Sequence, residues 1–150
     1  MPRRRENGLR SEDGSILPLA MFFGMLALAA VLLVVAATSL YLERERLYVV
    51  ADGAALAGAE AFDLGEVTLR GDAPHPMLRA ADVRAAAGGY LSSEAASGFH
   101  DLVLESASSR DGQSATVRLA ATWHPPMLSL FVPDGIRLRA TSTARSVLAR

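Results

Sequence analysis

The chain has 150 residues, a formal net charge of -1 and no cysteine. This length accommodates one membrane anchor and one modest domain, because compact domains most often contain about 100 to 150 residues. The lack of cysteine excludes disulfide bonds, cysteine-based zinc sites and thiol catalysis, so the fold depends on packing alone.

The first predicted element is a transmembrane helix over residues 16–40. No charged residue occurs between Gly14 and Leu42, and about 20 apolar residues suffice to cross a hydrocarbon core of about 30 Å. Arg and Glu alternate after this stretch, whereas the residues before it are enriched in arginine, namely Arg3, Arg4, Arg5 and Arg10. The positive-inside rule therefore predicts a cytoplasmic segment over residues 1–15 and an extracytoplasmic domain over residues 41–150, on a single-pass protein of the cell (inner) membrane.

Two other interpretations of the apolar stretch compete with the anchor. A secretory signal cleaved near Ala36 or Ala37 would share the basic start, but its apolar region would contain only about 7 to 15 residues, roughly half of what is present. A buried helix of a soluble protein is rarely this long without any charge. An uncleaved anchor accounts best for both the length and the composition.

The helix is expected to continue beyond the membrane, from about Tyr41 to Phe62, because no helix-breaking residue separates the two parts. Gly53 and Gly58 are tolerated weak points within it. Small residues recur every four positions and form two smooth ridges, Ala51, Ala55 and Ala59 in one and Gly53, Ala57 and Ala61 in the other. Such ridges favour close helix packing, either against the protein's own domain or against a neighbouring copy.

A second helix is predicted over residues 77–91, after a loop-like stretch that Pro74 and Pro76 interrupt. Its alanine content favours a helix, while Gly88 and Gly89 leave the position of its end open. We expect this helix to lie on the sheet that the last third of the chain forms.

Three antiparallel strands are predicted over residues 101–109, 114–123 and 136–147. Asp111 and Gly112 lie between the first two, and Asp-Gly is a strong signal for a two-residue hairpin turn. This turn predicts three facing pairs: Leu104 with Leu119, Glu105 with Arg118, and Ser106 with Val117. In the third strand apolar residues alternate with Arg and Thr, which predicts one apolar and one basic face. The predicted fold class is therefore α+β, with a small three-stranded antiparallel sheet.

The segment over residues 123–135 joins the second and third strands and is apolar but broken by prolines. Its apolar side chains are Met127, Leu128, Leu130 and Phe131. Two interpretations remain open: these side chains fill the core beside the sheet, or they form a loop that contacts a partner or the membrane.

The sequence shows no pattern typical of a catalytic, metal or cofactor site. His75, His100 and His124 are far apart in the chain, and none has the spacing of a metal-ligand motif. The common nucleophile-elbow, P-loop and dinucleotide-binding motifs do not occur. We therefore expect no enzymatic activity, no cofactor and no bound metal. Scattered arginines without interleaved aromatic residues also argue against a nucleic-acid partner.

One pattern in the N-terminal third is specific. Gly14 and Ser15 precede the apolar span, and a small-residue run follows it: Ala51, Asp52, Gly53, Ala54, Ala55, Leu56, Ala57 and Gly58. Over residues 11–62 this arrangement resembles the TadE/TadG-like proteins of tight-adherence (Flp) pilus and secretion systems, which typically have Gly-Ser before the span and an A-D-A-A-A-L-A-type motif after it. Gly53 stands where that family usually has Ala.

The resemblance implies a minor pilin-like or pseudopilin-like membrane protein that acts as a structural or assembly component of a pilus or secretion system. Its implied partners are the lipid bilayer and other pilus or secretion subunits, contacted through the N-terminal helix in a homo- or hetero-oligomer. Pseudopilins of this kind are cut by a prepilin peptidase after a Gly, with a Glu five residues into the mature chain, so Gly14 and Ser15 form the candidate processing site. The matching position here is Leu19, and an uncleaved anchor is the expected state.

An alternative hypothesis follows from the residues of the predicted sheet. Its basic face, formed by Arg118, Arg137 and Arg139, would suit an extracytoplasmic binding module for an anionic envelope ligand. Binding of this kind would weaken with salt, because screening acts on exposed charges.

Overall fold

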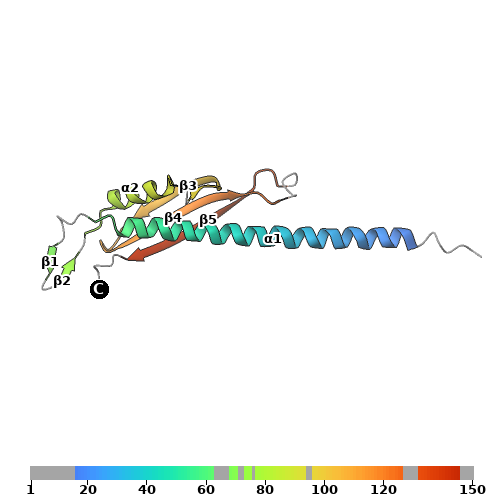
Figure 1. Cartoon of the computed structure of the whole chain (residues 1–150), viewed down its shortest axis with the longest axis horizontal. Coiled ribbons are helices and arrows are strands. Elements are labelled where there is room, and N and C mark those ends of the chain that lie inside the picture. The colour runs from blue at the N-terminus through green and yellow to red at the C-terminus, as the bar shows by residue number, and fades with distance from the viewer. Residues whose placement is uncertain are drawn as a thin grey trace, which may run out of the picture. The chain divides into compact units, whose positions relative to one another are not determined.

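The computed structural model describes residues 16–62, 68–70, 73–75, 77–93, 96–126 and 132–145. In chain order the elements are α1 (Ile16–Ala59), β1 (Thr68–Arg70), β2 (Ala73–His75), α2 (Ala80–Leu91), β3 (His100–Ser108), β4 (Ser114–Trp123) and β5 (Ile136–Arg145) (Figure 1). The predicted α+β class is confirmed, with a long N-terminal apolar helix, a second helix and a three-stranded antiparallel sheet.

Helix α1 continues without interruption through the predicted membrane boundary. Its only proline, Pro18, lies in the first turn, where the missing N–H costs little. The large apolar side chains between Ile16 and Val35 are mostly exposed, with relative exposures of 45% to 74%. By length and composition α1 is the one helix among the described residues that can cross a membrane. The exposure of its first half argues against a buried helix of a soluble protein.

The chain divides into two compact units, Met1–Val35 and Ala36–Arg150. Within the second unit α1 is amphipathic, with buried residues at helical spacing: Leu47, Val50, Ala51, Ala54, Ala55, Gly58 and Ala59. The division lies a few residues before the end of the predicted membrane span at residue 40. This division follows from contacts within the protein and not from the position of a bilayer. The predicted membrane boundary therefore stays a prediction.

Helix α2 begins at Ala80 rather than at the predicted residue 77. The preceding residues are held in another conformation, because the Leu78 N–H donates to the carbonyl oxygen of Gly112 at 2.9 Å. Arg79 accordingly has extended dihedral angles, φ −88° and ψ 138°. A contact with the hairpin loop, distant in sequence, therefore sets the start of this helix.

Gly88 and Gly89 lie inside α2, which ends after Leu91. The Ser92 hydroxyl donates to the Gly89 carbonyl at 2.7 Å. This bond satisfies a carbonyl group that the end of a helix otherwise leaves without a partner.

Strands β1 and β2 form a two-stranded antiparallel ladder in which Thr68 pairs with His75 and Leu69 with Pro74. The sequence does not predict this ladder, because the prolines of this stretch are typical of a loop. Proline is tolerated here because both strands of a two-stranded ladder are edge strands. Pro76 lies outside the described residues.

Strands β3, β4 and β5 pair in that order, each antiparallel to its neighbour. The predicted pair Leu104 and Leu119 is confirmed. The predictions that Glu105 faces Arg118 and that Ser106 faces Val117 are wrong, because the register shifts after Leu104 and Ser106 pairs with Arg118 instead. Glu105 is the extra residue of a β-bulge, which inserts one residue into a strand without a partner opposite.

The connection between β3 and β4 is also longer than the predicted two-residue turn. Ser108 and Thr116 form the last pair of the ladder. The Asp111 carboxylate accepts hydrogen bonds from the backbone N–H groups of Gln113 and Ser114 at 2.9 and 2.7 Å. The hairpin lies where Asp-Gly predicted it, but the aspartate side chain organises its loop.

One apolar core forms where the second half of α1, α2 and one face of the sheet meet. Its fully buried large side chains are Leu47, Val83, Val117 and Leu119. Alanines of α1 and β4 belong to the same core, and their small side chains allow the helix to approach the sheet closely. The amphipathic part of α1 is thus an integral part of the domain.

Candidate functional site on α1 and the sheet

The small-residue motif lies entirely in α1 and faces the protein's own core. Ala51, Ala54 and Ala55 have no exposed surface, and Gly58 is also buried. A Cβ atom on Gly58 would lie 3.0 Å from Val83 Cγ1 and 3.2 Å from Ala115 Cβ. At this position α1 therefore lies close to both α2 and β4. Of the two alternatives for the ridges, the alanines of the first ridge pack against the protein's own domain.

Gly53 lies against the side chain of Tyr90 from α2. A Cβ atom at Gly53 would be 2.2 Å from Tyr90 Oη and 2.4 Å from Tyr90 Cζ, so the ring rests directly on the glycine backbone. The remaining motif residues differ in exposure: Asp52 and Leu56 are exposed, and Ala57 is half-buried.

The motif carboxylate connects α1 to the sheet. The Ser142 hydroxyl of β5 donates to Asp52 Oδ1. The sequence alone gave no signal for this pair, because the two residues lie on elements at opposite ends of the chain. Asp52 therefore contributes to the attachment of β5 to α1, beyond being an exposed charge.

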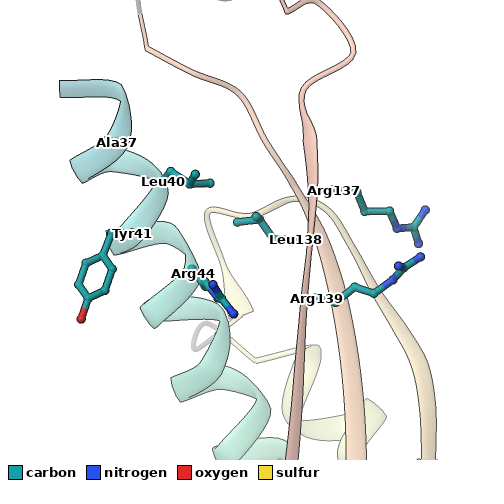
Figure 2. Close-up of a pocket in the computed structure, with 7 residues that line it drawn as sticks. All are labelled: Ala37, Leu40, Tyr41, Arg44, Arg137, Leu138 and Arg139. Atoms are coloured by element: carbon teal, nitrogen blue, oxygen red, sulfur yellow. The ribbon is translucent and has the colours of Figure 1, made fainter. Parts of the chain in front are cut away.

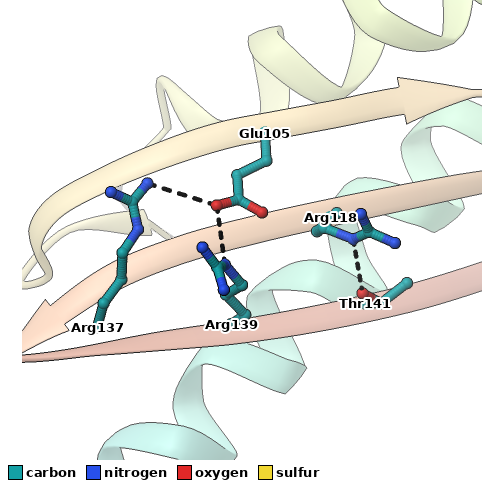
Figure 3. Close-up of polar contacts among 5 residues, drawn as sticks. All are labelled: Glu105, Arg118, Arg137, Arg139 and Thr141. Atoms are coloured by element: carbon teal, nitrogen blue, oxygen red, sulfur yellow. Dashed lines mark hydrogen bonds and ion pairs between the residues drawn. The ribbon is translucent and has the colours of Figure 1, made fainter.

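The basic face of the sheet also contains the carboxylate of Glu105, which the predicted register placed opposite Arg118. Glu105 Oε1 lies 3.4 Å from Arg137 Nη2 and 3.1 Å from Arg139 Nε (Figure 3). Arg118 Nε instead donates to Thr141 Oγ1 at 3.3 Å. Because Glu105 already engages two of the three arginines, this face is less suited to an anionic ligand than its sequence indicates.

A polar cluster lies beside the first turns of α1 in the second unit. The indole N–H of Trp123 donates to Ser39 Oγ at 3.2 Å. The rings of His100 and His124, far apart in sequence, meet edge to face with centroids 5.3 Å apart. Together with Glu43 these residues line a cavity of about 220 Å³. Among the described residues no group of three or more His, Cys, Asp or Glu side chains is arranged to hold a metal ion.

Two further hollows flank α1. One, of about 370 Å³, lies between α1 and the start of β5 and is lined by Ala37, Leu40, Tyr41, Arg44, Arg137, Leu138 and Arg139 (Figure 2). Arg44 Nη2 donates to the Tyr48 hydroxyl at 3.5 Å, and this bond raises the pKa of the guanidinium. The other, of about 390 Å³, is lined by Leu42, Glu45, Arg46, Val49, Val50, Ser97 and Phe99.

Two predicted features lie outside the described residues. One is the candidate processing site, Gly14 and Ser15. The other is the apolar part of the loop, residues 127–131, so its two interpretations stay predictions.

The N-terminal third of the chain is similar to a known protein family. Residues 14–61 match the Tad family model, described as "Putative Flp pilus-assembly TadE/G-like". This part of the chain is similar to TadE/G-like proteins. The match covers less than half of the 150 residues and stops just beyond the end of α1, so α2 and the three-stranded sheet lie outside it. No curated protein and no solved structure matched the chain.

The matched segment coincides with the long apolar helix, which by length and composition can cross a membrane. The structure also accounts for the departure at Gly53. The residue that leaves no room for a side chain there, Tyr90, lies outside the matched segment.

Proposed function

We propose that the protein is a minor pilin-like structural or assembly component of a Flp/Tad-type pilus or secretion system, with no catalytic role. The observation that carries this proposal is the match of residues 14–61 to a pilus-assembly family, over a helix that is apolar in its first half and packed into a domain in its second. A pseudopilin-like subunit needs both properties, since it must stay in the membrane and also hold a folded domain outside it.

We further propose a single-pass protein of the inner membrane with a cytoplasmic N-terminus and an extracytoplasmic domain. The arginines before the span support this orientation. A reporter enzyme that is active only outside the cytoplasm, fused to the C-terminus, should be active. Activity of the same reporter only when it is fused to the N-terminus would reverse the orientation.

The surface that we propose for contact with other subunits is an exposed apolar line on α1. Leu42, Val49 and Leu56 have relative exposures of 54%, 65% and 50%. They are spaced seven residues apart, which places them along one side of a helix. The buried alanines of the motif cannot serve this purpose, because they contact the protein's own sheet and α2.

Substituting this line tests the proposal in the source organism. The double variant Val49→Glu, Leu56→Glu should lose co-purification with pilus subunits and reduce piliation seen by electron microscopy. Glu45→Gln, an exposed change on the same helix, is the matched control and should leave both unchanged. Unaltered piliation and co-purification in the double variant, at normal protein levels, would contradict the proposed contact.

The state of the N-terminus is tested separately. Amino-terminal sequencing of protein extracted from membranes should find a start near Met1, as an uncleaved anchor requires. A start at Ser15 would indicate prepilin-type processing, and a start beyond Ala37 would indicate a secreted protein.

A further inference from the structure

Strand β5 is the unprotected edge of the three-stranded sheet. It pairs with β4 over ten consecutive positions without a bulge, from Ile136 with Trp123 to Arg145 with Ser114. The other edge, β3, contains two register shifts and has α2 beside it (Figure 1). Bulges and covering helices protect an edge strand from pairing with further chains. Among the described residues β5 has no bulge, and α1 contacts it through side chains of one face of the strand, Leu138 and Ser142.

The groove between α1 and β5 follows this open edge. It has a volume of about 370 Å³ and is lined by residues 137–139 of the strand. Figure 2 shows Leu40 and Leu138 pointing toward one another across it, while Arg137 and Arg139 point away from α1. The groove therefore has an apolar entrance next to the backbone of an edge strand. An extended peptide could form main-chain hydrogen bonds there and place alternate side chains in the groove.

Positive charge lies on both sides of this edge. Arg44 lines the groove on the α1 side. On the opposite face, the Arg137 and Arg139 side chains keep relative exposures of 56% and 65%, although both contact the single carboxylate of Glu105. An added strand with acidic side chains would therefore meet favourable charge on either face.

We propose that the free edge of β5 binds an extended, acidic segment of a partner protein, which adds a further strand to the sheet. An apolar side chain of the segment enters between Leu40 and Leu138, and the acidic side chains on the other face of the segment lie beside Arg139. This inference rests on the proposed function in one respect: it assumes that the domain contacts other proteins of the assembly. It adds the kind of segment by which such a protein binds.

A second copy of this chain is a poor occupant of the edge. Strand β5 carries three arginines, Arg137, Arg139 and Arg145, and no acidic residue. A second β5 beside it would bring like charges together across the new ladder, which is destabilising. The proposed segment is therefore an acidic one rather than the β5 strand of another copy.

An anionic lipid headgroup is the competing occupant, because residues 37–44 lie at the predicted membrane boundary. Only one of the three arginines that line the groove, Arg44, projects on the α1 side (Figure 2). A row of alternating N–H and C=O groups along β5 is matched in full by the backbone of another strand, whereas a headgroup phosphate could use only the N–H donors. These observations favour the peptide segment, and the experiment below separates the two.

The test uses the full-length protein in nanodiscs of phosphatidylcholine and a fluorescent peptide of alternating Glu and Val, followed by fluorescence anisotropy. The peptide should bind, and replacing one central Val with Pro should weaken binding about tenfold, because proline cannot donate to the ladder. A peptide of alternating Lys and Val should not bind. Hydrogen exchange should show added protection of β5 amides when the Glu-Val peptide is present.

Protein variants complete the test. Arg139→Glu should weaken binding of the Glu-Val peptide about tenfold, whereas Arg110→Glu, an exposed change in the hairpin loop, should not. The proposal is overturned by equal binding of the proline peptide, by equal effects of the two variants or by absence of binding. Displacement of the peptide when phosphatidylglycerol is included in the nanodiscs would assign the groove to lipid instead. The peptide-binding test does not measure piliation, so a negative result would not contradict the proposed function. Conversely, a negative piliation result would not change the interpretation of peptide binding.

Discussion

The packing of Tyr90 on Gly53 predicts that a substitution toward the family motif destabilises this protein. Gly53→Ala would restore the A-D-A-A-A-L-A pattern. In a helix without neighbours, the change from Gly to Ala stabilises by about 0.5 to 1 kcal/mol. Here the new Cβ would lie 2.2 Å from Tyr90 Oη and 2.4 Å from Tyr90 Cζ, so the ring must move.

The expected magnitude combines these two opposing effects. Overpacking of a filled site costs about 1 to 3 kcal/mol. The free energy of unfolding of Gly53→Ala should therefore fall by about 1 kcal/mol, within limits of about 0 and 2.5 kcal/mol, because the gain in helix propensity offsets part of the cost. In a Tyr90→Ala background the obstacle is gone, and the same substitution should stabilise by about 0.5 to 1 kcal/mol. The sign of the effect is predicted to reverse between the two backgrounds.

Urea unfolding of the detergent-solubilised protein provides the assay. The single tryptophan, Trp123, is buried in the domain, so its fluorescence reports unfolding of the domain rather than of the anchor. Gly89→Ala in α2 is the matched control, because a Cβ there meets no atom within 4 Å, and it should be neutral or stabilising. If Gly53→Ala stabilises equally in both backgrounds, the contact with Tyr90 does not exist as described.

Three further predictions use the same domain. Ser39→Ala should lower the free energy of unfolding by about 1 kcal/mol, because it removes the acceptor of the Trp123 indole N–H. Backbone N–H donors hold the pKa of Asp111 well below its ordinary value of 3.8, so its carboxylate should stay ionised at about pH 3 in a carbon NMR titration. Its stabilising contribution is present above the unfolded pKa and is lost as the pH falls through the lower folded value. Gly135→Ala should cost about 2 to 4 kcal/mol, because φ is +65° and the new Cβ would lie 2.6 Å from Thr122 Cγ2.

Each of these predictions has a control. Ser39→Thr retains the hydroxyl and should lose less stability than Ser39→Ala. A carboxyl signal of Asp111 that titrates near its ordinary pKa would refute the capping role. Gly98→Ala also changes a glycine with positive φ, but its Cβ would meet no atom within 4 Å, so it should cost less than Gly135→Ala. Equal losses at the two glycines would show that the contacts around Gly135 do not matter.

The sequence by itself determined the elements whose signals are local. An uncharged apolar run continued by a small-residue run predicted one uninterrupted helix, which α1 confirms. Alternation of apolar and polar residues predicted the strands, and Asp111 with Gly112 predicted the hairpin. The family resemblance also rested on contiguous residues, and the match to residues 14–61 confirms it. Such signals can be recognised in the sequence because each depends only on residues a few positions apart.

Only the tertiary structure decided the features that depend on contacts between distant segments. The bulge at Glu105 moved its carboxylate from Arg118 to the arginines of β5, which no local pattern signals. The bond from Ser142 to Asp52 joins residues 90 positions apart. The packing of Tyr90 on Gly53 likewise involves two helices whose relative placement depends on the whole core. Local periodicity specifies which face of a helix or strand is buried. The residues that contact this face depend on the packing of the complete domain.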